Sequence, residues 1–431
     1  MNFRKLISFS LFSILLLALS ACKGGDSREW LLAPDWSRAV MVGHTQSGDP
    51  APVVVDDNGR LYTFLATQIE NGESSPTLLA LDRELQPVWS ETIDQTLTLF
   101  DKPTLHWDGE AINMLWLHSK QLHLAKFSPS GEMVLPPAVL SGDVEVDDFT
   151  TAVSPQNELT IWFSGARRTP ILYALPTGDL TGKPVLIDPS GIRPSIQYDA
   201  DGVLHATWAN YPSGFGSSSY YYAAFDDPNA ATHESERTRI FERSFGVSDV
   251  LDGPKIAADN EIAYVFWTIS VRTGPAAGKV STEWMTFPLG QPDLRGEIRE
   301  LFAPISSELE YEYEPEGGLL AGARVSETAV SNQQRTYIVQ NITQLPGQHE
   351  EVAIIFETRI KYQYSQFQDQ AAIRFFADGN PNGYQLLSFT SKPSQHPSLA
   401  ADADQYLYMT WLQKEGGSGF DVYMASSASD I

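Results

Sequence analysis

Short runs of alternating apolar and polar residues follow one another along most of this chain, and their arrangement recurs. The segments Pro194–Trp208 and Pro397–Trp411 both place an aspartate five positions and a tryptophan fourteen positions after the first proline. Related segments begin at Pro52, Pro103 and Pro254. Two weaker copies, one with Ser154 at the aspartate position and one over residues 338–356, retain mainly the alternation. The chain is therefore built from a repeated unit, which governs the fold prediction.

Each part of the repeat has a structural reason to recur. Proline is tolerated at the first residue of a strand, where its missing N–H group is not needed. Aspartate and glycine favour a tight hairpin turn, because aspartate accepts local backbone hydrogen bonds and glycine adopts positive φ. The run after the turn alternates and ends on a large aromatic residue, as a half-buried strand does. A third strand follows in every unit and a fourth in most, including residues 385–389 of the sixth unit.

Four antiparallel strands in a unit of about 45–60 residues are typical of a β-propeller blade. The sequence predicts an all-β protein with a single β-propeller of seven four-stranded blades over residues 30–431. The last unit lacks a fourth strand, and the strand predicted at residues 38–44 is available to complete it and close the ring. Rings of six or eight blades, a stacked β-sandwich and several small β domains are the alternatives. The usual expectation of two or three domains for 431 residues is set aside.

The repeat resembles those of the sialidase-like (BNR-type) propellers, and the resemblance covers most of residues 45–431. It implies the fold rather than an activity. The compact Ser-x-Asp-x-Gly-x-Thr-Trp motif of that group is absent from the sequence. The arginine-bearing motif of the first sialidase blade is also missing, since residues 39–49 contain no arginine. We therefore do not expect sialidase activity.

The N-terminus has the pattern of an export signal. Arg4 and Lys5 precede an apolar run of fourteen residues, Leu6–Leu19, which is too short to span a bilayer as a helix. The run leads into Leu19-Ser20-Ala21-Cys22, which resembles a bacterial lipobox. This resemblance implies a lipoprotein signal peptide at residues 1–21, acylation of Cys22 and a lipidated tether at residues 22–29. An ordinary signal peptide is the alternative.

The lipobox resemblance also implies a location in the cell. In Gram-negative lipoproteins an aspartate directly after the cysteine favours retention in the inner membrane, and this chain has Lys23 there. We therefore expect attachment to the outer membrane of a Gram-negative bacterium, on its periplasmic or its surface face. Several acyl chains hold a protein on a membrane more firmly than one.

Composition excludes several classes of function. The chain has 29 Lys+Arg against 54 Asp+Glu, a net charge of −25, which argues against a nucleic-acid partner. Removal of residues 1–21, which carry two positive charges, makes the charge −27. A single cysteine excludes an internal disulfide framework and a cysteine-based zinc site. We expect no cofactor and no metal centre, and the acidic turns at residues 56–59 and 199–202 are interpreted as turns rather than calcium loops.

One set of residues could support catalysis. A polysaccharide lyase of propeller fold needs a histidine or tyrosine base and an arginine that neutralises charge. His205, Tyr211 and Arg193, with Arg167 and Arg168 nearby, lie in neighbouring units and are the weak candidates for these roles. A histidine inside a strand is more often a packing residue, which is the competing interpretation of His205.

An acidic segment interrupts the repeat between the fifth and sixth units, at residues 304–335. Five glutamates alternate with other residues there, with two tyrosines among them, and a strand would place the carboxylates on one face. They are Glu308, Glu310, Glu312, Glu314 and Glu316, with Tyr311 and Tyr313 between them. Close carboxylates repel one another. A structural cation or a basic partner would stabilise the ladder, so we interpret this insertion as a partner-binding segment, with a solvated loop as the alternative.

The sequence favours a lipid-anchored envelope protein that binds or scaffolds a protein or glycan partner without catalysis. A polysaccharide-degrading lyase or glycosidase at the cell surface is the alternative. A structural subunit of an envelope assembly is a third possibility.

Overall fold

The computed structural model describes residues 39–427 with internal gaps. The residues outside the description are 1–38, 69–73, 94–100, 166–169, 178–182, 211–216, 245–249, 259–260, 271–279, 301–309, 314–322, 327–342, 346–350, 362–366, 378, 387–393, 403, 405, 415–418 and 428–431. Backbone alone is described for some residues inside strands, including β22–β25.

The described strands form seven four-stranded antiparallel sheets, and each begins with a strand of the repeat. The first three sheets are β2 (Val53–Val55), β3 (Leu61–Gln68), β4 (Ser74–Leu81) and β5 (Pro87–Thr92); β6 (Asp101–Trp107), β7 (Ile112–His118), β8 (Gln121–Phe127) and β9 (Met133–Val139); and β10 (Val146–Val153), β11 (Leu159–Gly165), β12 (Leu172–Leu175) and β13 (Val185–Asp188). The next two are β14 (Gly191–Tyr198), β15 (Leu204–Asn210), β16 (Ser217–Phe225) and β17 (Thr238–Ser244); and β18 (Val250–Ala258), β19 (Ile262–Ser270), β20 (Val280–Pro288) and β21 (Arg299–Glu300).

The last two sheets complete the set. They are β24 (Thr343–Leu345), β25 (Glu351–Lys361), β26 (Phe367–Ala377) and β27 (Asn380–Leu386), followed by β28 (Ser394–Ala401), β29 (Leu407–Gln413), β30 (Phe420–Ser426) and β1 (Val40–Thr45). Two short 3-10 helices, η2 (Pro228–Ala230) and η3 (Pro292–Leu294), lie in connections.

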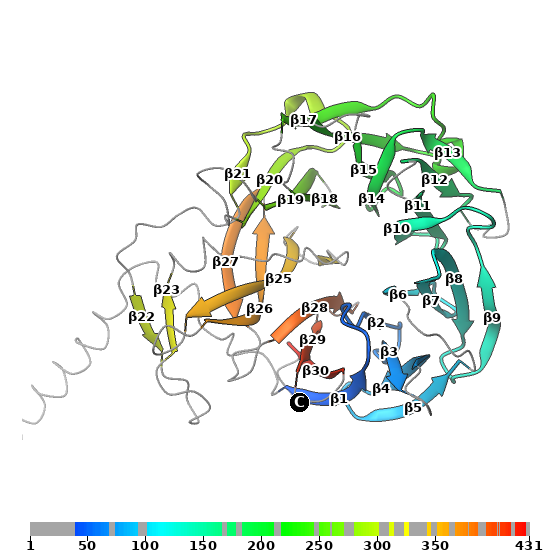
Figure 1. The fold of residues 1–431 in the computed structure, drawn as a ribbon, viewed down its shortest axis with the longest axis vertical. Coiled ribbons are helices and arrows are strands. Elements are labelled where there is room, and N and C mark those ends of the chain that lie inside the picture. The colour runs from blue at the N-terminus through cyan, green and yellow to red at the C-terminus, as the bar shows by residue number, and fades with distance from the viewer. Residues whose placement is uncertain are drawn as a thin grey trace, which may run out of the picture.

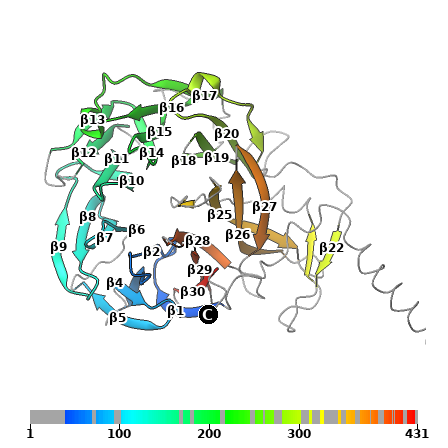
Figure 2. The ribbon, with the colours of Figure 1, turned by 180° about the vertical axis from the view of Figure 1, so that it is seen from behind.

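The seven sheets stand in a ring with one strand of each facing the middle (Figure 1). Each sheet contacts the next, and the sheet that begins with β28 contacts the sheet that begins with β2. The N-terminal strand β1 pairs antiparallel with β30, opposing Val40 to Met424, so the two ends of the described chain share a sheet. The view from behind shows the same closed order (Figure 2). This arrangement is a β-propeller, as the repeat predicted.

The predicted elements and the observed strands agree closely. The strand predicted at residues 38–44 is β1, in the place that the sequence assigned to it. The seven four-stranded sheets match the seven predicted units. One strand is displaced: the fourth strand of the sixth sheet is Asn380–Leu386 rather than residues 385–389. Asn380 pairs with Ala377 at the end of β26, and Gly379 between the two strands has a φ of 72°.

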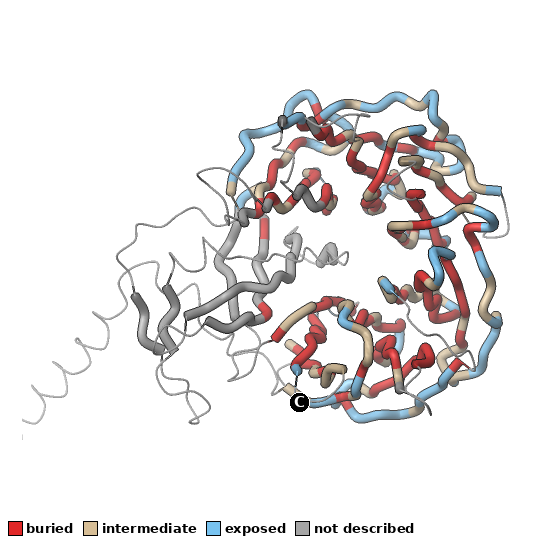
Figure 3. The backbone as a smooth tube through the Cα atoms, viewed as in Figure 1, coloured by how far each residue is buried: buried red, intermediate tan, exposed pale blue. Residues whose placement is uncertain are grey.

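The core lies between neighbouring sheets. The tryptophans that end the second strands of five units are fully buried, at 1% exposure or less. These are Trp116, Trp162, Trp208, Trp267 and Trp411. One cluster joins Phe64 and Leu78 of the first sheet to Met114 and Trp116 of the second. Burial therefore follows the second and third strands of each sheet, while the outer strands are largely exposed (Figure 3).

The predicted insertion at residues 304–335 contains a two-stranded sheet of its own. Strand β22 (Glu310–Tyr313) pairs with β23 (Ala323–Ser326), and Glu312 opposes Arg324 in the register. Both views place this pair outside the ring (Figures 1 and 2). Residues 310–313 of the acidic ladder are an extended strand. Glu308, Glu314 and Glu316 lie outside the described residues.

Candidate functional site

The two ends of each first strand carry different polar structures, and the hairpin turn forms one of them. In the first sheet, Asp56 Oδ1 accepts hydrogen bonds from the backbone N–H groups of Asn58 and Arg60, both at 2.9 Å. Its other oxygen, Oδ2, accepts from the buried Tyr62 hydroxyl at 2.9 Å. Gly59 takes a φ of 76° in this turn. The repeat aspartate therefore organises the turn and also satisfies a buried donor in the next strand.

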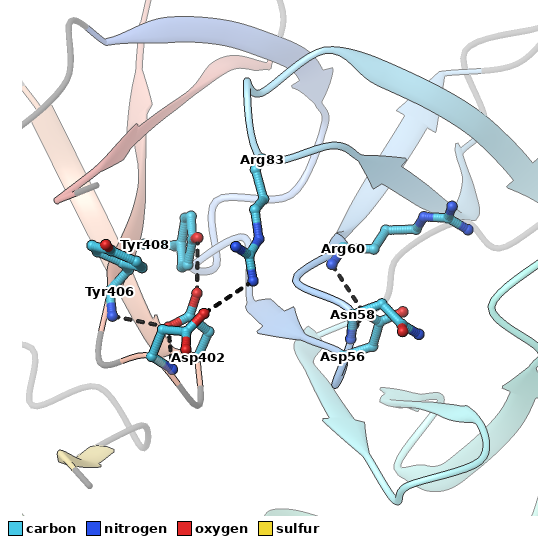
Figure 4. A network of polar contacts seen from close by, with 8 residues as sticks. Asp56, Asn58, Arg60, Arg83, Asp402, Tyr406 and Tyr408 are labelled. Atoms are coloured by element: carbon cyan, nitrogen blue, oxygen red, sulfur yellow. Dashed lines mark hydrogen bonds and ion pairs between the residues drawn. The ribbon is translucent and has the colours of Figure 1, made fainter. Parts of the chain in front are cut away.

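The last sheet repeats this arrangement (Figure 4). Asp402 Oδ1 accepts from the N–H groups of Asp404 and Tyr406, and Oδ2 accepts from the Tyr408 hydroxyl at 3.1 Å. Arg83 of the first sheet reaches Asp404 at 3.3 Å and links the two neighbouring sheets. Burial raises the pKa of Tyr408, so the hydroxyl stays protonated and donates. The interpretation of the acidic segments 56–59 and 199–202 as turns is confirmed by these hydrogen bonds and by the matching ones of Asp199.

The candidate base His205 belongs to this turn structure. It is 1% exposed, its Nε2 lies 2.9 Å from Asp199 Oδ2, and its Nδ1 lies 2.7 Å from the Tyr222 hydroxyl. A neutral imidazole that donates from Nε2 to the Asp199 carboxylate accepts the Tyr222 hydroxyl at Nδ1. Tyr222 in turn accepts the Gly290 N–H group at 3.1 Å. Both ring nitrogens are engaged inside the protein, which leaves neither of them to take a proton from a substrate.

The sequence candidates for catalysis do not come together. His205 opposes Gln197 near the turn end of the hairpin β14–β15, whereas Arg193 lies near its other end. Arg193 and Gln197, the residue opposite His205, are four positions apart in β14, which is roughly 13 Å along a strand at about 3.3 Å per residue. Tyr211, Arg167 and Arg168 lie outside the described residues. The described part of the set therefore forms no acid–base pair, which agrees with the packing interpretation of His205.

The other end of the first strands carries an irregularity that repeats around the ring. In β6, β14, β18 and β28 the register with the second strand shifts at the start of the strand, beside the repeat proline. Strand β10 has a shift at the same place without a proline. In four of these strands the residue before the proline has positive φ: Lys102 at 54°, Arg193 at 52°, Gly253 at 110° and His396 at 52°. Such bulges redirect a side chain. They do so here on the inner strands, around the axis of the ring (Figure 1).

Lys102 and Asp148 of two neighbouring inner strands pair at this end, and Arg193 and Lys255 lie at the same end of the next two inner strands. We name Lys102, Asp148, Arg193 and Lys255 the axial cluster. Lys102 Nζ of β6 pairs with Asp148 Oδ1 of β10 and donates to the Asp147 carbonyl at 3.1 Å. Burial alone would raise the pKa of Asp148, but the Lys102 ammonium lowers it. The positive charges of Lys255 and Arg193 act in the same direction, so the pKa of this carboxyl lies below its usual value.

The segment before β2 places a second carboxylate, that of Asp49, beside the axial cluster. Asp49 Oδ2 accepts the Lys102 backbone N–H group at 2.8 Å. Burial raises the pKa of Asp49, and the negative charge of Asp101 adds to the effect. The two carboxyls beside Lys102 therefore differ: the pKa is raised at Asp49 and lowered at Asp148.

His106 lies on the same inner strand, β6, and hydrogen-bonds Thr151 of β10. Burial lowers the pKa of His106 to about 4. An unfolded imidazole has a pKa near 6.5, so the unfolded chain binds the proton more tightly. We expect the free energy of unfolding to fall as the pH drops from about 6.5 to about 4, by at most about 3 kcal/mol from this group.

Urea denaturation at several pH values tests this contribution. The His106→Gln variant should lose that part of the pH dependence, while His233→Gln, at an exposed histidine, should keep it. An unchanged slope in His106→Gln would show that His106 does not contribute.

Among the described residues, no group of three or more histidine, cysteine, aspartate or glutamate side chains could hold a metal ion. Within the same residues, no helix has the length and apolarity needed to cross a membrane. The carboxylates of the axial cluster are engaged by Lys102, whose side chain and backbone N–H group act as donors. The cation that pairs with the Asp148 carboxylate is therefore a side chain of the protein itself.

Sequence reasoning found Arg193 but missed Lys102, Asp148 and Lys255. The signal was present, because Lys102, Arg193 and His396 each stand directly before a repeat proline. Their shared position could have marked them as equivalent residues of neighbouring units. What the sequence could not show is the register shift in β6, β14 and β18, beside which Lys102, Arg193 and Lys255 lie.

The chain matches no protein-family model and no curated protein. It is similar to solved structures, among them Trypanosoma rangeli sialidase, with a TM-score of 0.45, 12% identity, and coverage of 92% of this chain and 60% of that one. The chain thus spans 60% of the length of that sialidase. A protein of unknown function from Dyadobacter fermentans has a TM-score of 0.45 and 9% identity, with 91% of this chain and 99% of that one covered. The fold is assigned from the chain's own sheets.

Proposed function

We propose that this protein is a lipid-anchored propeller of the bacterial cell envelope that binds a partner without chemically transforming it. The axial cluster is the observation that carries the proposal. Four separate inner strands contribute charged side chains to it, two of them at or beside positive-φ residues that precede a repeat proline. Left-handed backbone at non-glycine residues is costly and tends to occur at functional positions. A structure assembled in this way suits recognition at the axis.

We propose binding without catalysis because His205, the candidate base that the structure describes, is not available to a substrate. A general base must reach the proton that it removes, and both nitrogens of this ring are bonded inside the hairpin network. The alternative is an enzyme acting on acidic polysaccharide, and the presence of Arg193 in the axial cluster favours it, since a lyase needs a cation to neutralise a uronate. Incubation with polygalacturonate, followed by ultraviolet absorbance of unsaturated products, separates the two. Product formation by the purified protein would overturn the binding proposal.

The anchor is proposed from the lipobox at Cys22, and replacement of that residue tests it. Native protein should sediment with outer membranes and incorporate labelled palmitate. Cys22→Ala should do neither and should appear almost entirely in the soluble fraction, because acylation requires the thiol. The Lys23→Asp variant is the matched control for the choice of membrane. It should remain acylated but move to the inner membrane. Sedimentation of Cys22→Ala with membranes would contradict the lipid anchor.

The acidic insertion is proposed as a second surface for a protein or glycan partner. Its two-stranded sheet is separate from the seven sheets of the ring, so deletion of residues 304–335 should leave the ring folded. Crosslinking in intact cells before and after the deletion would show whether a partner is lost. Identical crosslinked products would assign partner binding elsewhere.

A further inference from the structure

Strand β9, the outer strand of the second sheet, has no polar side chain along its seven residues. Among the described residues, eight large apolar side chains are exposed, and three of them lie on this one strand: Met133 at 40%, Val134 at 61% and Val139 at 44%. Singly scattered apolar residues are ordinary on a protein surface, whereas apolar residues that gather on one element mark a contact. Strand β9 is therefore a candidate contact surface.

The first sheet extends this surface. Its outer strand β5 lies beside the turn that leads into β9, where Trp89 Nε1 donates to the Pro129 carbonyl at 3.1 Å. The residue before Trp89, Val88, is 47% exposed. Both views show β5 and β9 following one another along the outside of the ring (Figures 1 and 2). We name the exposed apolar residues of these two strands the apolar rim: Val88, Met133, Val134 and Val139.

The outer strand on the other side of the ring has a different surface. Strand β17 of the fourth sheet lies across the ring from β5 in both views (Figures 1 and 2). Its exposed side chains include Arg239, Glu242 and Arg243. Arg239 pairs with Glu242, and Arg243 pairs with Glu283 of the next sheet. An outer strand of this fold can thus carry charged side chains, so the fold does not require the apolar residues of β5 and β9.

The open edge of β9 is a poor template for another strand. Pro136 and Pro137 lie in the middle of β9, and neither has an N–H group to donate to a neighbouring strand. Proline on an edge strand is one of the means by which proteins prevent edge-to-edge pairing. A partner at this surface therefore contacts side chains rather than the backbone, and those side chains are apolar.

The N-terminal part of the chain would hold this side of the ring near a membrane. Cys22, the proposed site of acylation, precedes Ala39 by 17 residues, and 17 residues extend at most about 60 Å. Ala39 leads into β1, the outer strand of the last sheet, and β1 contacts β3 of the first sheet. Met41 of β1 is itself exposed. A lipid anchor at this distance gives the neighbouring outer strands a high local concentration at the bilayer surface.

We infer that the apolar rim rests on the lipid bilayer to which the protein is anchored. The inference rests on the proposed lipid anchor and names the surface that the anchored ring turns towards the membrane. Apolar side chains enter the boundary between headgroups and acyl chains to a depth of about 5–10 Å. The contact is apolar rather than electrostatic, since a net charge of −25 makes anionic headgroups repel the chain. We therefore expect docking on zwitterionic phosphatidylcholine and weaker docking where anionic lipid is added.

Hydrogen exchange of a tethered chain provides the test. The chain has one cysteine, so the unacylated mature protein can be coupled through Cys22 to a maleimide lipid in phosphatidylcholine vesicles. Exchange of residues 133–139 of β9 should be at least about fivefold slower on the vesicles than in solution, and added salt should not reverse this slowing. Residues 238–244 of β17 should exchange equally fast in both states. Unchanged exchange of β9, or equal slowing of β9 and β17, would overturn the inference.

Two matched variants assign the slowing to the apolar rim. Val134→Asp places a charge at the most exposed of the three β9 side chains and should abolish the slowing, because a carboxylate does not enter the apolar boundary. Leu294→Asp is the control, since it makes the same kind of change at an exposed residue of η3, and it should keep the slowing. Both positions are exposed, so both variants should fold. Slowing that survives Val134→Asp, or that is lost in both variants, would contradict the assignment.

A concentration series separates the bilayer from a second copy of the chain. If exchange of β9 slows in the absence of vesicles as the protein concentration rises, the surface joins two copies and the membrane contact is overturned. The maleimide lipid supplies the anchor, so the result does not depend on natural acylation of Cys22. A missing palmitate label would refute the natural anchor alone, whereas unchanged exchange of β9 on vesicles would refute the docking surface alone.

Discussion

A chain that begins at Gln46 should fail to form a stable monomeric ring, whereas a chain that begins at Ala39 should form one. The difference is β1, which pairs with β30 from Val40–Met424 to Thr45–Phe420 and contributes Val42 to the core. Thr45 also accepts the Ala66 N–H group, which ties β1 to the first sheet. Loss of this ladder and its buried contacts should lower the free energy of unfolding by at least about 3 kcal/mol.

Denaturant titration and size-exclusion chromatography measure this effect. The shorter chain should unfold at lower denaturant and form soluble aggregates, because the unpaired edge of β30 can pair with another molecule. A synthetic peptide of residues 39–45 added in excess should partly restore the monomer. Equal midpoints and monomeric elution of both chains would show that β1 is dispensable for ring closure.

Replacement of Asp402 by alanine should lower the stability of the protein strongly. The carboxylate accepts the backbone N–H groups of Asp404 and Tyr406 and the hydroxyl of Tyr408, which is fully buried. Alanine leaves three donors without their acceptor, and the hydroxyl has no access to water. We expect the free energy of unfolding to fall by about 3 kcal/mol, mostly from the unsatisfied hydroxyl.

Two further variants make this expectation specific. Asp404→Ala removes a neighbouring carboxylate whose partner Arg83 is exposed, and it should cost less than about 1 kcal/mol. The double variant Asp402→Ala, Tyr408→Phe should recover part of the lost free energy of unfolding, because it removes the unsatisfied hydroxyl together with its acceptor. If the double variant is no more stable than Asp402→Ala, the buried hydroxyl is not the main cause.

The repeat allowed the ring to be predicted from sequence because its residues act locally. Asp56, Asp199 and Asp402 bond to backbone two and four residues ahead or to a side chain six residues ahead, so spacing alone specifies the turn. The closing strand could be predicted by counting strands. The last unit lacked a fourth strand, and the strand predicted at residues 38–44 belonged to no unit. The strand β27 was misplaced because its residues, Asn380–Leu386, do not alternate between apolar and polar, so the pattern favoured the more apolar run that follows.

The candidate site was harder to predict because it depends on contacts between sheets. His205 could be recognised as a histidine in a strand, but its two partners come from a turn six residues back and from the third strand, at Tyr222. Lys102 meets Asp148 only because neighbouring inner strands start at the same level around the axis. Alternation fixes the face of a strand on which a residue lies, but it does not fix the level at which two strands meet.

The pairing of β1 with β30 also sets an order in time for the folding of this protein. The contact between Val40 and Met424 joins residues separated by almost the whole chain, and loop closure makes such contacts form late. The first strand to leave the ribosome must wait for the last one to be synthesised before the ring can close. Closure of the ring by β1 and β30 is therefore the step that completes folding.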